Sequence, residues 1–319
     1  MAAMARRLLT FVALLQISRV GLVFTAISNI WLVVWLSSAE GDSAEAIPYD
    51  ALAGSAAVAV GMYIFGMTLN DVLDMRRDRV LAPDRPLPSR RIRPATATIL
   101  AFGALLVAIA ASVPLGTRSA LLCTATAAMV LFYNGPGKHI AGLGVLTLGL
   151  IRGAHMLIAD PGLGYLWPVW LTITHVVGLS ALCHRLEDKR PLLLGAHLWI
   201  VALGWAFVSV VMIGWMEQRD SLTLLGRPWI WAGPAAAIFG FLCLAVYTVG
   251  KTPRPQAAGG LLIKYGLIWL IVYDTAWLAG AGLWLAAAIH AMLIPATWLL
   301  MAAVRWLKLL AQTPAGFQR

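Results

Sequence analysis

Residues 51–78 read ALAGSAAVAVGMYIFGMTLNDVLDMRRD, an apolar run that continues without a break into a cluster of acidic and basic residues. A helix needs about 20 mostly apolar residues to cross the hydrocarbon core of a bilayer, and residues 51–70 meet that requirement. Charged side chains at the mouth of a membrane helix are costly to desolvate, so they indicate a functional site. The stretch therefore predicts a membrane helix that carries a polar site at one end.

The rest of the chain repeats the apolar part of this pattern. Of its 319 residues, 61% are hydrophobic and 12% are charged, which excludes an ordinary soluble domain. We expect ten membrane spans, at residues 16–37, 51–70, 95–114, 117–133, 140–159, 165–183, 192–215, 228–249, 262–282 and 284–303. The last two adjoin at Gly280 to Gly282 and are alternatively one broken element, which would make nine. The sequence thus predicts an all-α, polytopic helical bundle, with residues 1–319 as a single membrane domain.

The net charge of +10 would by itself suit a nucleic-acid-binding protein, but the positive residues follow the predicted membrane topology instead. On the side of the N-terminus, basic residues lie at 76–93, 138, 185–190, 251–254 and 305–308. The other side holds only Arg118, Arg219 and Arg227. This is the positive-inside bias of membrane proteins. We therefore expect no nucleic-acid partner, and a multi-pass protein of the bacterial inner membrane whose N-terminus and polar loops are cytoplasmic.

Four oxygen-bearing residues end the second span: Asn70, Asp71, Asp74 and Asp78, called the acidic motif below. The three acids are three, four and seven residues apart, so a continuing helix places them on one face. Carboxylates so arranged repel each other unless a cation lies between them, and Mg²⁺ binds through one or two carboxylates plus substrate phosphates. A metal site here implies a phosphorylated ligand. The alternative is a solvated helix end whose acids pair with nearby basic residues, Arg76, Arg77 and Arg79.

Two further charged segments are expected on the same side of the membrane. A proline-rich loop follows the acidic motif, and its arginines between Arg85 and Arg93 suit diphosphate oxygens. The stretch CHRLEDKRP at 183–191 ends the sixth span, and the four intervening spans return it to the side of the motif. It is either a second acidic cluster, with Glu187 and Asp188 as carboxylates, or an ordinary charged loop.

Other polar residues lie in or beside the apolar spans. Lys138, in a Gly/Pro turn after Tyr133, is either a topology anchor or a phosphate contact. Arg152 and Asp274 lie within spans, so we expect both to face the bundle interior, toward each other or toward substrate. The histidines of the spans have no metal-ligand spacing and are interpreted as helix-contact residues: His155, His175 and His290.

These residues resemble a known family, the UbiA superfamily of intramembrane prenyltransferases. Asn70 to Asp78 matches its NDxxDxxxD motif, and RPLPS at 85–89 matches the segment that follows the motif there. The turn from Tyr133 to Lys138, GLIRG at 149–153 and CHRLEDKRP at 183–191 are similar to further family segments. The resemblance covers nearly the whole chain.

The resemblance implies a helical bundle with a central cavity, in which Mg²⁺ holds an isoprenyl diphosphate. It implies an enzyme, a prenyltransferase that passes the prenyl group to a lipophilic acceptor, expected to be aromatic. The implied metal ligands are Asn70, Asp71, Asp74, Asp78, Glu187 and Asp188. The implied diphosphate contacts are Asn70, Arg85, Lys138, Arg152 and Lys189, and the implied catalytic residues are Asp71, Asp74 and Lys138.

One departure concerns the second charged stretch. The family has an aspartate where this chain has His184, and imidazole is a poor ligand for Mg²⁺. The second metal site is therefore rebuilt around Glu187 and Asp188, holds one ion fewer, or is inactive. The pattern is similar to the EboC-like branch of the superfamily. It leaves open an alternative function, a catalytically altered protein that binds or transports an amphiphilic metabolite.

Overall fold

The computed structural model describes residues 2–40, 47–219 and 229–312. These residues form twelve α-helices, three short 3-10 turns and no strand, so the prediction of an all-α protein is confirmed. The helices are α1 Ala2–Ile17, α2 Val23–Glu40, α3 Tyr49–Leu73, α4 Met75–Leu81, α5 Pro94–Ser112, α6 Thr117–Asn134, α7 Leu143–Leu157, α8 Trp167–Leu186, α9 Gly195–Glu217, α10 Trp229–Lys251, α11 Pro255–Gly280 and α12 Trp284–Gln312. Arg227, one of the basic residues expected on the far side of the membrane, lies outside the described residues.

Eight helices of the described chain are long and apolar enough to cross a membrane: α2, α3, α5 and α8 to α12. The remaining two expected spans fall on α6 and on the shorter apolar helix α7. The last two expected spans are separate helices, α11 and α12, joined by a turn. The protein is thus an integral, multi-pass membrane protein.

The first expected span, residues 16–37, is broken in the structure. Arg19 adopts a left-handed backbone conformation with φ 45°, and a 3-10 turn at Val20–Leu22 leads into α2. The Tyr63 hydroxyl donates a hydrogen bond to the Arg19 carbonyl oxygen at 3.1 Å, which ties the break to α3. α1 is consequently a separate helix, which apolar composition alone did not predict.

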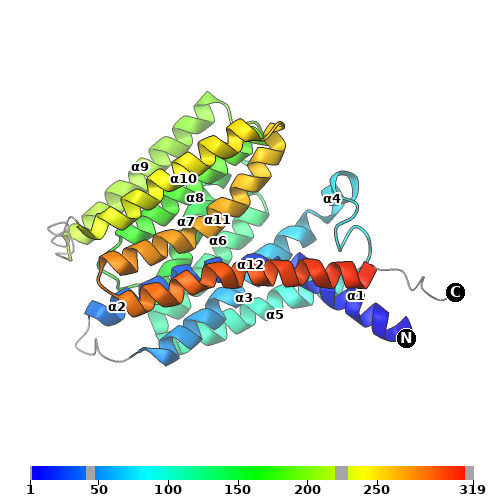
Figure 1. Cartoon of the computed structure of the whole chain (residues 1–319), viewed down its shortest axis with the longest axis horizontal. Helices are drawn as coiled ribbons and strands as arrows, with labels where there is room; N and C mark the ends of the chain where they lie inside the picture. The colour runs from blue at the N-terminus through cyan, green and yellow to red at the C-terminus, as the bar shows by residue number, and fades with distance from the viewer. Residues whose placement is uncertain (1, 41–46, 220–228, 313–319) are drawn as a thin grey trace.

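The helices pack around α2, which belongs to both large apolar cores. Its residues Leu32 to Leu36 lie in the core shared by α7 to α12, and Ile30 lies in the core with α3, α5 and α6. In Figure 1, α9 and α10 form the upper edge of the bundle and α3 and α5 the lower edge, with α11 and α12 crossing between them. The cavity described below lies between these two halves.

Helices at the edges of the bundle turn apolar side chains outward. Ile99 and Leu106 of α5, Phe207 of α9 and Val246 of α10 are all exposed. Large exposed apolar surfaces are unfavourable in water but match the hydrocarbon of a bilayer. These faces are therefore the lipid-contacting surface of the bundle.

The segments expected on the cytoplasmic side gather at one end of the bundle. Arg91, in the loop before α5, donates a hydrogen bond to Gln16 of α1 at 2.9 Å. Glu187, at the end of α8, packs against Gly259 in the first turns of α11. Figure 1 shows α4, the start of α1 and the end of α12 at the same end of the molecule.

Candidate functional site

The acidic motif lies at the point where α3 gives way to α4. Asp74 caps α3 and precedes α4, yet its amide bonds the Asn70 carbonyl oxygen at 2.9 Å, and the Asp78 amide bonds the Asp74 carbonyl oxygen at 2.8 Å. The helical hydrogen-bond pattern therefore continues across the break. This keeps the four side chains within one short stretch at the mouth of the bundle.

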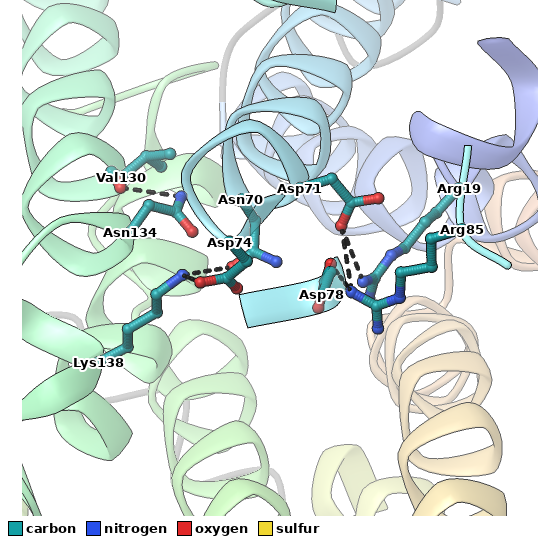
Figure 2. A network of polar contacts seen from close by, with 9 residues as sticks. All are labelled: Arg19, Asn70, Asp71, Asp74, Asp78, Arg85, Val130, Asn134 and Lys138. Carbon is teal, nitrogen blue, oxygen red and sulfur yellow. Dashed lines mark hydrogen bonds and ion pairs between the residues drawn. The ribbon is translucent and has the colours of Figure 1, made fainter. Parts of the chain in front are cut away.

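Lys138 brings the first cation to the motif. It lies in the short turn between α6 and α7, and its Nζ is 2.7 Å from Asp74 Oδ1 and 3.1 Å from Asn70 Oδ1 (Figure 2). The side chains of Lys138 and Asp74 are only 12% and 14% exposed. A charge-assisted hydrogen bond shielded in this way is stronger than a surface ion pair. Lys138 thus occupies a cation position between two oxygens of the motif.

Arg85 and Arg19 bring two further cations to the other side of the motif, as Figure 2 shows. Arg85 Nη1 lies 2.6 Å from Asp78 Oδ2 and 3.8 Å from Asp71 Oδ1. Arg19, at the break between α1 and α2, donates a hydrogen bond from Nη2 to Asp71 Oδ1 at 3.4 Å. Asp71 and Asp78 are each 6% exposed. A second cation position therefore lies between these two buried carboxylates.

The motif is not a solvated helix end, so the alternative raised from the sequence is wrong. Two of its acids are buried, and its cationic partners are Lys138 and Arg19 from distant segments and Arg85 from the following loop. The basic neighbours expected to pair with it are exposed on α4 and form no ion pair in the described chain: Arg76, Arg77 and Arg79. α4 directs them toward solvent, which adjacency in sequence did not predict.

The donor chemistry of the motif fits a hard divalent ion. Within the described ranges, no three acidic, histidine or cysteine side chains converge on one point. However, Lys138 and Arg85 each hold a positive charge between two motif oxygens. Carboxylate and amide oxygens are the ligands of hard cations, and Mg²⁺ needs only one or two of them when phosphate oxygens and water complete its shell.

A cavity of about 360 Å³ opens beside the motif, and the predicted central cavity is thereby confirmed. Apolar side chains from α2, α3, α6, α7, α8 and α11 form most of its wall. Four basic residues line it: Arg19, Lys138, Arg152 and Lys189. No Asp or Glu of the described part of the chain does so. Because Arg19 and Lys138 also bind the acidic motif, they connect it to the cavity.

Arg152 is held in the cavity wall by polar residues of α2. Its Nε donates to Asn29 Oδ1 at 2.6 Å, and its Nη2 donates to the carbonyl and hydroxyl oxygens of Thr25 at 2.6 and 3.1 Å. Asp274 Oδ2 in turn accepts from Asn29 Nδ2 at 2.7 Å and from the Ser28 hydroxyl at 2.6 Å. The expected interior placement of Arg152 and Asp274 is confirmed, with Asn29 lying between them.

The second charged stretch contributes basic residues to the cavity. Glu187 Oε2 lies 2.8 Å from Lys189 Nζ, so these two side chains pair with each other. Asp188 is exposed and adopts a left-handed φ of 47°. His184 lines the cavity, and its Nε2 lies 2.8 Å from the Pro191 carbonyl oxygen. Glu187 is paired and Asp188 is exposed, and their role as metal ligands stays a prediction.

Sequence reasoning missed Arg19 and Asn29. Both lie within the first expected span, where a charged residue or an amide costs as much free energy as Arg152 does in its span. That cost is a signal in the sequence. Their partners, however, lie far along the chain on other helices and follow only from the packing.

No protein-family model matches the chain. Among curated proteins, the digeranylgeranylglyceryl phosphate synthase of Metallosphaera sedula is 31% identical over 133 residues, which cover 39% of this chain and 46% of that protein. The Escherichia coli protein named "Probable D,D-dipeptide transport system permease protein DdpB" is 32% identical over 211 residues, which cover 62% of this chain and 59% of that protein. The chain thus spans about half the length of the curated relatives it matches.

Solved structures match a larger share of this chain than the curated sequences do. The structure of a digeranylgeranylglyceryl phosphate synthase in membranes matches 85% of this chain and 98% of its own, with a TM-score of 0.61 and 18% identity. A UbiA homolog from Archaeoglobus fulgidus, solved with GPP and Mg²⁺, matches 91% of this chain and 99% of its own, with a TM-score of 0.46 and 13% identity. The first of these likenesses shows that the two chains share a fold.

Proposed function

We propose that this protein, which has the fold of digeranylgeranylglyceryl phosphate synthase, is an intramembrane prenyltransferase of the UbiA type. It transfers a prenyl group from an isoprenyl diphosphate to a lipophilic, aromatic acceptor. The observation that carries this proposal is the cavity, whose wall is apolar while basic side chains line it beside the acidic motif. An isoprenyl diphosphate has the same two parts, an apolar chain and an anionic head.

The basic residues of the cavity act on the leaving group. When the bond between the allylic carbon and the diphosphate oxygen breaks, negative charge grows on the diphosphate. Fixed cations in a site of low dielectric constant stabilise that charge strongly, because they need no reorganisation during the reaction. Lys138, Arg152 and Lys189 are the groups placed for this, with Arg19 beside them. The apolar wall keeps out water that would compete with the acceptor.

In this proposal the acidic motif would hold the metal. Asn70, Asp71, Asp74 and Asp78 would supply its oxygen ligands, which Lys138 and Arg85 bind in the structure. Bound Mg²⁺ would neutralise diphosphate oxygens as a Lewis acid. On ligand binding, Lys138 and Arg85 exchange their carboxylate partners for phosphate oxygens, which they bind as donors.

The end of the bundle that carries the motif faces the cytoplasm of a bacterial cell in this proposal. The positive-inside bias supports this orientation, because the segments that gather at this end carry most of the basic residues. The isoprenyl diphosphate then enters from the cytoplasmic side, and the acceptor enters from the bilayer.

A carrier is the second candidate function, and one comparison favours it. The curated protein that matches the larger part of this chain is named as a transport system permease, and His184 departs from the family pattern. A carrier would use the basic cavity to hold an amphiphilic, phosphate-bearing metabolite without chemistry.

Binding of geranyl diphosphate by the purified protein in lipid nanodiscs tests the site. We expect binding that requires Mg²⁺ in the wild type and falls at least roughly tenfold in Asp71→Ala with Asp74→Ala, because the metal loses two ligands. Asp84→Ala is the matched control, since Asp84 is an exposed acid of the same loop region outside the motif. Binding that is independent of the metal, or equal in the double variant and the control, would overturn the site.

A further inference from the structure

Lys264 is a basic residue within the apolar span of α11, and it forms no ion pair with the described residues. Its Nζ lies 4.2 Å from the centre of the Trp298 ring of α12 and 5.6 Å from that of the Tyr265 ring. The two rings attract the ammonium group through cation–π contacts, but they leave its charge uncompensated. Because a charge in a membrane span is costly, Lys264 indicates a contact beyond these rings.

Arg305 of α12 places a second positive charge beside Lys264. It follows Trp298 by seven residues, which is two turns along the same face of the helix. Arg305 is exposed, pairs with no acid of the described chain, and lies close enough to Lys264 for the two charges to repel each other. A lysine that extends to the interface on its own has no need of a second cation from another helix. Lys264, Tyr265, Trp298 and Arg305 are called the basic patch below.

The basic patch lies near the membrane surface on the side of the acidic motif. Lys264 follows the start of α11 by nine residues and Arg305 precedes the end of α12 by seven, which is roughly 14 and 10 Å along the two helices. Both helix ends are on the motif side, since α11 starts beside Glu187 and α12 ends at the same end of the molecule as α4 (Figure 1). Long basic side chains reach from this depth to the lipid headgroups, where Trp and Tyr are also enriched.

The basic patch is separate from the cavity. Its neighbours Ile263 and Leu267 line the cavity, whereas no residue of the patch and no described residue of α12 does so. Close to the patch in sequence, Leu261 of α11 and Leu299 of α12 are 38% and 70% exposed. Apolar side chains at the edge of a membrane bundle contact acyl chains. The patch therefore combines positive charge at the level of the headgroups with an apolar surface that faces lipid.

We propose that the basic patch binds the phosphate group of an anionic phospholipid. The lysine ammonium and the arginine guanidinium donate hydrogen bonds and cannot accept them, and phosphate oxygens accept from both. A phosphate between Lys264 and Arg305 replaces one repulsion with two attractions. The acyl chains of the lipid lie against the exposed apolar side chains beside the patch. Basic pockets between membrane helices select anionic headgroups in this way.

The net charge of the headgroup decides which phospholipid the basic patch prefers. Phosphatidylcholine also carries a phosphate, but its trimethylammonium group adds a third cation to a patch that already holds two. Phosphatidylglycerol carries the phosphate without a cation. Each basic residue near a membrane surface strengthens the binding of an anionic lipid roughly fivefold. The patch is therefore expected to prefer phosphatidylglycerol, and this preference does not depend on prenyl transfer.

Native mass spectrometry of the protein in detergent, titrated with dioleoylphosphatidylglycerol or dioleoylphosphatidylcholine, tests this proposal. We expect the wild type to bind its first phosphatidylglycerol roughly tenfold or more tightly than phosphatidylcholine. Lys264→Met with Arg305→Met should bring this ratio to about one. Arg305→Met alone, which changes an exposed residue, should give an intermediate ratio.

Lys251→Met with Arg254→Met is the matched control for the double variant. It removes the same charge from two exposed residues at the same end of the bundle, and it should keep the wild-type preference. Lys264→Arg retains the positive charge and should keep most of the preference. An equal affinity of the wild type for the two lipids, or an equal loss in the control and in the double variant of the patch, would overturn the proposal.

Thermal unfolding separates a lipid site from a structural role and from a site for free phosphate. The double variant of the patch loses no ion pair seen among the described residues, so its midpoint without lipid should be close to that of the wild type. Phosphatidylglycerol should raise the wild-type midpoint more than that of the double variant, and inorganic phosphate should not. A clear fall in the midpoint without lipid, or an equal rise with inorganic phosphate, would contradict the lipid site.

Geranyl diphosphate binding, measured on the same samples, distinguishes the basic patch from the site beside the acidic motif. Because the patch lies outside the cavity, the wild type and the double variant of the patch should bind geranyl diphosphate equally. If the double variant instead loses geranyl diphosphate and phosphatidylglycerol together, the patch serves the isoprenyl diphosphate and its assignment to a phospholipid is wrong.

Discussion

Lys138 and Arg85 hold positive charge where the proposed chemistry needs a metal. Each lies between two oxygens of the acidic motif, so the carboxylates are compensated without an ion. Removal of one partner from a shielded ion pair leaves an uncompensated charge, which is more costly than the pair is stabilising. In the proposed function, metal binding would exchange cations at the motif, and its affinity would depend on these side chains.

Lys138→Met tests this exchange. Without metal, we expect the variant to lose about 1–3 kcal/mol of stability because Asp74 loses its cationic partner. Added Mg²⁺ should raise the unfolding midpoint of the variant by more than that of the wild type, because the competing ammonium is gone. Thermal unfolding at several Mg²⁺ concentrations measures both effects.

Lys251→Met is the control for that series, since Lys251 is an exposed lysine at the end of α10. It should match the wild type with and without Mg²⁺. A Mg²⁺ response in Lys138→Met that is equal to or smaller than the wild-type response would contradict the exchange.

At the scale of elements, the close contact between α3 and α5 sets the position of the acidic motif. Gly61 of α3 lies directly against α5, where an added Cβ would come within 2.6 Å of the Ala104 carbonyl oxygen. Small residues allow membrane helices to approach closely, and van der Waals packing then holds them together. The motif follows at the end of the same helix, so this contact fixes where its acids lie.

Gly61→Ala should therefore destabilise the protein by about 1–3 kcal/mol, the usual effect of forcing extra volume into a packed contact. Gly103→Ala on α5 is the matched control, because an added Cβ there meets no atom within 4 Å. Since alanine favours helix over glycine, this control should be neutral or slightly stabilising. Thermal unfolding in one detergent measures the stabilities of both variants. Equal unfolding midpoints for the two variants would contradict the packing argument.

Individual elements differ in how well the sequence predicted them. Each of the ten expected spans contains one helix of the structure, although the first is interrupted at Arg19, because apolar length is a property of the local sequence. The break at Arg19 was not predicted, since it depends on contacts with Tyr63 and Asp71 on another helix. α3 ends at Leu73 and α4 begins at Met75, so the acidic motif spans two consecutive helices rather than one uninterrupted helix.

In the candidate site, too, the sequence predicted local features but not contacts between helices. Clustered acids in an apolar context marked the motif in the sequence, because charge at a membrane helix is costly. Their partners Lys138 and Arg19 were identifiable only from the packing, since contacts between distant segments are not a local property, whereas Arg85 lies seven residues after Asp78. That the ring nitrogens of His155 have no hydrogen-bond partner among the described residues is likewise visible only from the packing.

At the scale of the whole molecule, the charged residues of the acidic motif and its partners lie beside a cavity whose wall is mostly apolar. The cavity extends from Lys138, which binds the acidic motif, to Arg152 and His155, and helices from both halves of the bundle line it. This arrangement lets an anionic group bind at the mouth while an apolar chain and an acceptor lie within. An enzyme and a carrier would both use such a cavity, and only the enzyme would break the bond to the diphosphate.

Pyrophosphate release from geranyl diphosphate by the protein in nanodiscs, with a mixture of lipophilic phenols as acceptors, tests the central claim most directly. We predict release that requires Mg²⁺, depends on the phenols, and falls by about two orders of magnitude or more in Asp71→Ala with Asp74→Ala. Mg²⁺-dependent binding of the diphosphate without any release of pyrophosphate would contradict the account and favour a carrier.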